Sequence, residues 1–140
     1  MTDPVVPATA AMAREEAERL LGTCAIHRDL GLELTEWRHG QVRFTFRPPA
    51  SVRSGDEGFI HGGALATALD TAACFAVIAA VGTDCSTIDL RTDFLRPASA
   101  QELSVTGTCL RAGRRFGVAD ATVIAPDGKL VATARGTFTW

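Results

Sequence analysis

The residues most able to do chemistry stand in one stretch, His61-Gly62-Gly63 followed by Asp70. Paired glycines at the start of a helix leave backbone N–H groups bare, and such groups can bind a developing oxyanion. Asp70 stands among Ala, Leu and Phe residues, where a carboxylate loses hydration that must be compensated. The pattern predicts either a catalytic carboxylate facing a cleft or an N-cap that starts a helix at Thr71. His61 alone also fits an ordinary loop histidine.

The spacing of these residues constrains how they could cooperate. If Gly62 begins a helix, Asp70 lies about 12 Å further along the axis, whereas catalytic contacts operate at about 3 Å. Gly62 and Asp70 of one chain therefore cannot both contact a single carbonyl group. A two-fold dimer with antiparallel helices would bring Gly62 of one subunit against Asp70 of the other and create two equivalent composite sites.

The segment that carries Asp70, residues 62–82, is apolar on nearly every side. It is long enough to raise the question of a membrane span, but it contains Asp70 and eight Ala residues, which favours a buried helix of a globular core. One face of a sheet cannot cover such a helix completely. We therefore expect a second subunit to cover the remainder.

The rest of the chain supplies a sheet. Alternating apolar residues predict two strands between residue 32 and residue 47, and Pro126-Asp127-Gly128 is a hairpin signal. The other expected elements are a helix over 10–21, a loop over 51–58 and strands over 86–95, 101–111, 114–125 and 129–140. In the strand over 114–125, Phe116, Val118, Thr122 and Ile124 share one face. We expect one α+β domain over residues 1–140, with a mainly antiparallel, strongly curved sheet around the helix and a flexible tail over residues 1–10.

The composition of the chain argues against several classes of function. The 140 residues carry a net charge of −2 with no block of one sign, so a nucleic-acid or anionic-membrane surface is not expected. The four cysteines form no C-x-x-C pair and the three histidines lack zinc-ligand spacing, so no metal is expected. The first 13 residues do not read as a signal peptide, which predicts a cytoplasmic location with reduced thiols.

Beyond these patterns, the chain resembles a known family from about residue 30 to residue 140. The similar segments are the run from His61 to Ala72, Thr87-Ile88-Asp89-Leu90, and Phe94-Leu95-Arg96-Pro97-Ala98. They resemble the hotdog-fold acyl-CoA thioesterases of the PaaI-like, phenylacetic-acid-degradation type. The resemblance implies a long central helix wrapped by a curved antiparallel sheet, subunits paired edge to edge as a homodimer or a dimer of dimers (homotetramer), and active sites at the subunit interface.

The resemblance also implies roles for individual residues. The Gly62 N–H would bind the thioester oxygen, His61 would position or polarise the thioester, and Thr87 would orient the nucleophile or water. Asp70 of the partner subunit would be the nucleophile or the general base. The substrate would be an acyl-CoA, and no cofactor beyond the coenzyme A of that substrate would be needed.

Further residues are candidates for substrate binding. An acyl pocket would be shaped by Phe59, Ile60, Phe75 and Ile78, which also fit a place in the core. Gly63 is a further candidate, and Cys74 is expected to line a pocket or pack in the core rather than attack. The coenzyme A phosphates would meet Arg96, Arg114 and Arg115.

One position departs from the family. Many relatives carry Asn six positions before the histidine, where this chain has Gly55, so Ser54 or Asp56 would have to substitute. The departure keeps a non-catalytic, acyl-CoA-binding hotdog module as an alternative, and an enoyl-thioester hydratase is a less favoured one. Aromatic, short-chain and medium-chain acyl groups all remain compatible with the sequence.

Overall fold

The computed structural model describes residues 11–140, so the tail expected over residues 1–10 lies outside the described residues. The helices are α1 (Arg14–Gly22), α2 (Ala25–Asp29) and α3 (Gly62–Val81), with a single 3-10 turn, η1 (Ala50–Val52). The strands are β1 (Leu32–Arg38), β2 (Gln41–Phe46), β3 (Arg53–Ser54), β4 (Phe59–Ile60), β5 (Ser86–Phe94), β6 (Leu103–Ala112), β7 (Phe116–Ile124) and β8 (Leu130–Thr139).

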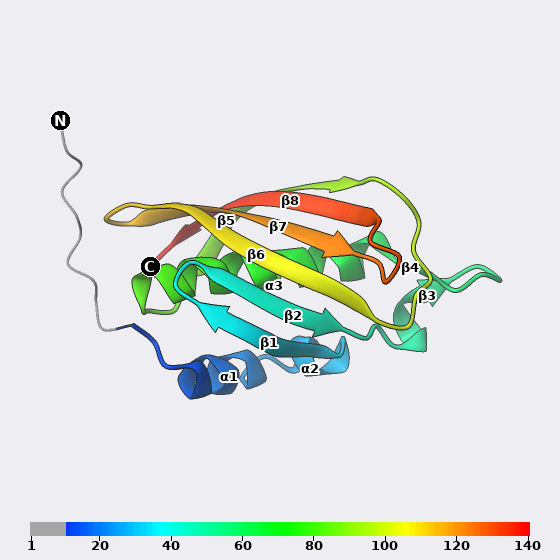
Figure 1. The fold of residues 1–140 in the computed structure, drawn as a ribbon, viewed down its shortest axis with the longest axis horizontal. Helices are drawn as coiled ribbons and strands as arrows, with labels where there is room; N and C mark the ends of the chain where they lie inside the picture. The colour runs from blue at the N-terminus through cyan, green and yellow to red at the C-terminus, as the bar shows by residue number, and fades with distance from the viewer. Residues whose placement is uncertain (1–10) are drawn as a thin grey trace.

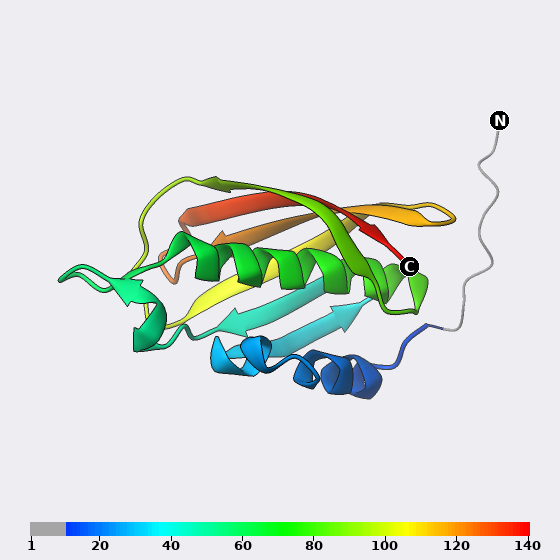
Figure 2. The ribbon, with the colours of Figure 1, turned by 180° about the vertical axis from the view of Figure 1, so that it is seen from behind.

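Six of these strands form one antiparallel sheet in the order β1-β2-β6-β7-β8-β5. The sheet curves around α3, which lies along its concave side, while α1 and α2 lie beside β1 (Figures 1 and 2). The expected α+β hotdog fold, with a long central helix, a curved antiparallel sheet and an N-terminal helix, is confirmed. β1 and β5 form the two edges of the sheet.

Helix α3 forms where the sequence predicts it. Ala and Leu favour the helix, His61 is its N-cap, and Gly82 ends it with a left-handed φ of +77° that glycine adopts without strain. Its length and composition would suit a membrane span, yet 67% of the most apolar stretch is buried within the fold. α3 is therefore the core helix of this fold.

Close approach of α3 to the sheet depends on one glycine. Gly107 of β6 lies beneath the carbonyl group of Ala72, and a Cβ atom at this position would collide with that carbonyl. The core beside this contact is filled by side chains such as Phe44 and Phe75, whose rings meet edge to face at 5.7 Å. A side chain at residue 107 would lift the helix that carries Asp70.

Several sequence predictions need correction. The N-terminal helix covers Arg14–Gly22 rather than 10–21, and the expected loop over 51–58 contains the end of η1 and the strand β3, which pairs with β4. α2 was not predicted, because its five residues include no buried one and so show no apolar period. In β7 the buried face consists of Gly117, Ala119, Ala121 and Val123, opposite to Phe116 and Ile124. The small residues of this face give α3 room to approach.

Candidate active site

The N-terminus of α3 presents a free hydrogen-bond donor. His61 caps the helix, its Nδ1 accepting the Gly63 N–H at 2.9 Å, and its carbonyl accepts the N–H groups of Ala64 and Leu65. Among residues 11–140, the Gly62 N–H has no such partner. It therefore lies bare at the positive end of the helix dipole, where an oxyanion is stabilised.

Phe94, the last residue of β5, lies beside Gly62. Its ring atoms lie 3.4 to 3.7 Å from the position that a Cβ atom of residue 62 would take. The ring itself is about half exposed, at 52%. Phe94 thus forms an apolar wall beside the Gly62 N–H without closing access to it.

Asp70 lies in the middle of α3, where the alternative of an N-cap is wrong because the helix has already run since Gly62. Its carboxylate is partly buried, and the Thr87 hydroxyl on β5 donates a hydrogen bond of 2.8 Å to Oδ1. No ion pair to Asp70 is found within the described part of the chain. The structure therefore brings Thr87 and Asp70 together, as required if Thr87 orients this carboxylate.

Asp70 and Gly62 do not meet within one protomer. Both lie on one straight helix, eight residues apart, which separates them by about 12 Å along its axis. The two halves of the predicted chemistry are thus present in one chain but at separate points of α3.

Cys74 follows Asp70 by one helical turn. Its thiol donates to the Cys85 carbonyl over 3.6 Å, and burial raises the pKa of the Cys74 thiol well above its usual range. Burial, reinforced by the charge of Asp84, also raises the pKa of Cys85 to about 12. Thiols held protonated in this way are poor nucleophiles.

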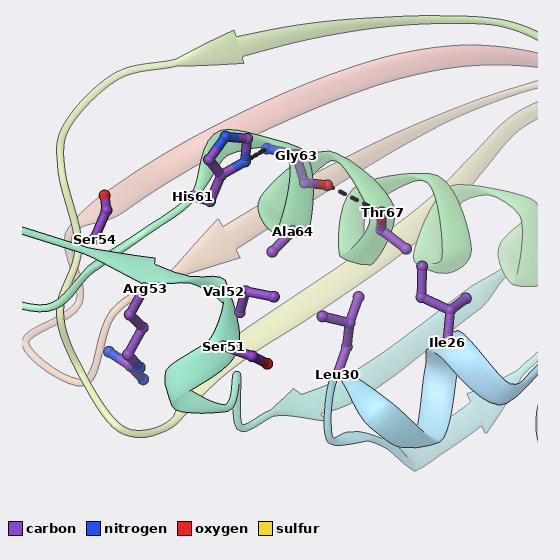
Figure 3. A pocket seen from close by; sticks show the side chains of 10 residues that line it. All are labelled: Ile26, Leu30, Ser51, Val52, Arg53, Ser54, His61, Gly63, Ala64 and Thr67. Carbon is purple, nitrogen blue, oxygen red and sulfur yellow. Dashed lines mark hydrogen bonds between the residues drawn. The ribbon is translucent and has the colours of Figure 1, made fainter.

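A pocket of about 350 Å³ opens beside the start of α3, between α2, η1 and β3 (Figure 3). Its lining residues are Ile26, Leu30, Ser51, Val52, Arg53, Ser54, His61, Gly63, Ala64 and Thr67. Gly63, a candidate substrate-binding residue, lies in this lining, and so does His61. Phe59 and Ile60 of β4, expected to shape an acyl pocket, are not among the lining residues, and Ile60 is buried in the core.

The arginines expected to bind phosphates are exposed and are not among the residues that line this pocket. Arg96 follows β5, and Arg114 and Arg115 form the β6–β7 turn at the end of the molecule opposite to the start of α3 (Figure 1). An arginine that does line this pocket, and that the sequence analysis does not single out, is Arg53. Its guanidinium donates to the carbonyls of Pro48, Gly58, Ser99 and Ala100.

Arg53 therefore connects three loops near the start of α3, namely those after β2, between β3 and β4, and between β5 and β6. The backbone of this region reinforces the arrangement, because the His61 N–H donates to Val52 and the Ile60 N–H donates to Ala98. No signal in the sequence distinguishes Arg53 from the other arginines, since its acceptors are carbonyls and not acidic side chains.

Gly55, where many relatives carry Asn, lies in the turn between β3 and β4. Gly55 has a φ of +71°, a conformation that Gly and Asn adopt more readily than other residues. Of the two residues considered as substitutes, Ser54 lines the pocket, whereas Asp56 is exposed outside it. Ser54 is therefore the better placed of the two.

Within residues 11–140, no group of three or more His, Cys, Asp or Glu side chains is arranged to hold a metal ion. The structure presents three features at separate points of α3: a bare backbone donor at its start, a carboxylate with its hydroxyl partner in its middle, and a largely apolar pocket beside its first turns. These are groups that acyl transfer uses.

Comparisons with known proteins agree with this arrangement. The sequence profile described as the thioesterase superfamily matches residues 57–132. The medium/long-chain acyl-CoA thioesterase YigI of Salmonella typhimurium is 29% identical over 93% of this chain and 97% of its own length. The acyl-coenzyme A thioesterase PaaI of Escherichia coli is 30% identical over 89% of this chain and 88% of its own length.

The fold comparison gives the same result. A crystal structure of a protein from the thioesterase superfamily superposes with a TM-score of 0.84 at 31% identity, covering 90% of this chain and 96% of the other. The E. coli PaaI protein from the phenylacetic acid degradation operon superposes with a TM-score of 0.82 at 27% identity, covering 89% and 90%.

Proposed function

Because the chain belongs to the thioesterase superfamily, we propose that it hydrolyses acyl-CoA thioesters to a free acid and coenzyme A. The observation that carries this proposal is the hydrogen bond of 2.8 Å from Thr87 to Asp70, which fixes a carboxylate on an otherwise apolar helix. A carboxylate held in this way serves hydrolysis, whereas binding alone does not require it.

The thioester carbonyl oxygen accepts the Gly62 N–H at the start of α3. Negative charge grows on this oxygen as the carbonyl carbon is attacked, and the helix dipole and the N–H stabilise it. His61 holds the first turn through its bond to Gly63 and stands beside the reacting group.

Asp70 supplies the activated oxygen by one of two routes. As a general base it takes a proton from water while the water oxygen bonds to the carbonyl carbon, the C–S bond breaks, and the thiolate leaves and is protonated. As a nucleophile it attacks the carbonyl carbon, the C–S bond breaks, the coenzyme A thiolate leaves and is protonated, and water hydrolyses the mixed anhydride that has formed. Thr87 occupies Oδ1 in either route, so Oδ2 is the oxygen available for the reaction.

Two subunits complete the site. β5 is an edge strand, and Ile88, Phe94 and Leu95 along it are each 52% exposed, which leaves an apolar border for a partner. A two-fold axis beside β5 would make the two α3 helices antiparallel. Asp70 of one protomer would then lie at the same site as the Gly62 N–H of the other. We propose a homodimer as the active unit, with a dimer of dimers as a further assembly.

The same axis gives Arg114 and Arg115 a role. Their turn lies at the C-terminal end of α3, and an antiparallel arrangement brings that end toward the start of the partner's α3. Their guanidinium groups can then meet the coenzyme A phosphates of the neighbouring site, together with the exposed Arg96.

Thiol release from a panel of acyl-CoA thioesters, with Asp70→Asn assayed beside the unmodified protein, tests the proposal. The panel spans phenylacetyl-, benzoyl-, short-chain and medium-chain substrates, because the site residues alone do not select among them. Asp70→Asn should lower kcat by about 100-fold or more and leave acyl-CoA binding intact.

Three other results would contradict parts of the proposal. Full turnover in Asp70→Asn would remove Asp70 from the mechanism. Binding without release by the unmodified protein would favour an acyl-CoA-binding module, for which the glycine at position 55 is the motivating observation. Hydration of an enoyl-CoA without release of thiol would make the protein a hydratase.

A further inference from the structure

We propose that the pocket between α2, η1 and the first turns of α3 binds the acyl chain, that it favours unbranched chains of medium length, and that Ile26 of α2 sets the limit. The inference rests on the proposed function and goes beyond it by naming the substrate class and a residue that determines it.

The pocket adjoins the proposed oxyanion donor at the start of α3. His61 and Gly63, which flank Gly62 in the chain, both line it. A thioester whose carbonyl oxygen is held by the Gly62 N–H therefore has one of its two substituents at the mouth of this pocket. The two substituents are the acyl chain and the pantetheine arm of coenzyme A.

The lining selects the acyl chain over the pantetheine arm. The apolar lining residues are Ile26 and Leu30 from the region of α2, Ala64 from α3, and Val52 from η1 across the pocket (Figure 3). Amide and hydroxyl groups of a pantetheine arm would lose their hydration against these residues without gaining partners. An alkyl chain gains free energy there for every methylene that it buries.

The polar residues at this pocket do not contradict that selection. The Thr67 hydroxyl donates to the Gly63 carbonyl at 2.9 Å, and the Arg53 guanidinium is engaged by four backbone carbonyls. Both are satisfied within the protein and so require nothing from a ligand. Ser51, Arg53 and Ser54 lie on the side of the pocket away from α2, in the direction of the β3–β4 turn (Figure 3).

Helix α2 forms one wall of the pocket, and a bound acyl chain would cover its exposed apolar surface. None of its five residues is buried, and Ile26, an apolar β-branched residue, is 46% exposed while lining the pocket. An alkyl chain in the pocket would cover Ile26 and remove this exposed apolar surface from water.

The size and chemistry of the pocket favour medium, unbranched chains. Its volume of about 350 Å³ stands near the lower end of the range for small-molecule sites, and no Phe, Tyr or Trp side chain lines it to stack on an aryl group. Acetyl groups would leave it mostly empty, and hexadecanoyl groups would project beyond Ile26.

The test is the acyl-chain profile of the full-length protein and its Ile26 variants. For the unmodified protein, kcat/KM should rise by about fourfold per methylene from butanoyl- to octanoyl-CoA, the gain for burial of one CH₂ group, and then level off. Ile26→Trp should lower kcat/KM for octanoyl-CoA by about tenfold or more and change that for acetyl-CoA by less than about twofold.

Two further variants make the result specific. Ile26→Ala should move the preferred chain length upward, because it shortens the wall. Ile124→Trp is the matched control, since Ile124 is also an exposed isoleucine but does not line the pocket, and its profile should match that of the unmodified protein.

The outcomes separate this inference from the proposed function. If the protein releases thiol but Ile26→Trp leaves the chain-length profile unchanged, the chain lies elsewhere and the inference is wrong. If no substrate is hydrolysed, the proposed function fails, and calorimetric binding of octanoyl-CoA decides the inference. In that case, weaker binding by Ile26→Trp than by Ile124→Trp supports it, and equal binding contradicts it.

Discussion

At the scale of single residues, the proposed hydrolysis depends on one backbone donor and one oriented carboxylate. The Gly62 N–H is bare because His61 accepts the next N–H in the chain, that of Gly63. The Asp70 carboxylate is oriented because Thr87 reaches it from a strand that begins after α3 has ended. The Gly62 N–H and the Thr87 hydroxyl can each be removed by a single substitution with little change to the surrounding structure.

Gly62→Pro tests the backbone donor. Gly62 is the first residue of α3, the helical position at which proline is favoured, and His61 before it is already extended at φ −60° and ψ 136°. The variant should fold but lose the oxyanion donor, so kcat should fall by about 100-fold to 1,000-fold. Steady-state kinetics with the preferred acyl-CoA measure this.

Gly62→Ala is the control for that experiment, because it keeps the N–H and its Cβ would stand 3.4 Å from the exposed Phe94 ring. Its kcat should remain within about threefold of that of the unmodified protein. An active Gly62→Pro variant would show that the carbonyl oxygen is held by another group.

Thr87→Val tests the orientation of the carboxylate. Valine has the shape of threonine without the hydroxyl, so Asp70 loses a hydrogen bond to its charged form that is worth about 1.5 to 3 kcal/mol. We expect kcat to fall by about 10-fold to 100-fold with little change in KM, and Thr87→Ser to restore most of it. Equal kcat values in the Val and Ser variants would mean that the contact has no role in the reaction.

At the scale of elements, the sheet carries an ion pair whose effect depends on pH. On neighbouring strands β7 and β8, Arg135 donates two hydrogen bonds to Asp120, one to each carboxylate oxygen, and these hold the pKa of Asp120 below its usual value. A depressed carboxylate pKa stabilises the fold above the unfolded-state value of about 4, and this stabilisation disappears as the pH falls through the folded-state pKa.

Arg135→Met therefore should lower the free energy of unfolding at pH 7 only slightly, because Arg135 is exposed to solvent and Asp120 is partly exposed. Below the folded pKa of Asp120 the variant and the unmodified protein should be equally stable. Urea unfolding at pH 7 and at low pH measures both values. A difference that persists at low pH would assign the effect to packing of the arginine stem.

How far the elements could be predicted from sequence depends on their length and burial. The long helix and the strands of the main sheet have apolar periods over many residues, and their bounds were predicted to within about two residues except at the N-terminal helix. Two-residue strands such as β3 and β4 have no period to detect. The same is true of α2, whose N-cap, Cys24, makes no side-chain cap.

Some residues of the candidate site could be predicted from the sequence and others could not. His61, Gly62 and Asp70 stand out in the sequence because they are unusual on an apolar helix, and Thr87 was added from the resemblance. The apolar lining of the pocket could not be predicted. Ile26 lies in the short helix α2, Leu30 follows it and Val52 ends the 3-10 turn η1, and these residues meet α3 only in three dimensions.

At the scale of the whole molecule, the fold separates the two groups that the reaction needs to combine. The bare N–H and the carboxylate are separated by about 12 Å on one rigid helix, and no bend of α3 brings them closer. The exposed apolar residues of the edge strand β5 supply a surface on which a second chain could restore the combination.

Subunit mixing tests this composite site directly. Gly62→Pro and Asp70→Asn homodimers should each be nearly inactive, since every site lacks one group. In a mixed dimer, one site carries both substitutions and the other carries none. Random exchange of equal amounts makes half of the dimers mixed, so activity should return to about a quarter of that of the unmodified protein.

A site built within one chain gives the opposite result, because every site then keeps its own defect and mixing restores nothing. The two variants mixed under conditions that prevent subunit exchange serve as the control. Exchange itself can be followed by mass spectrometry of the intact dimers, so that a lack of activity with proven exchange would contradict the interfacial site. Recovery in step with the mixed-dimer population would establish that the partner subunit supplies Asp70 to the oxyanion site of its neighbour.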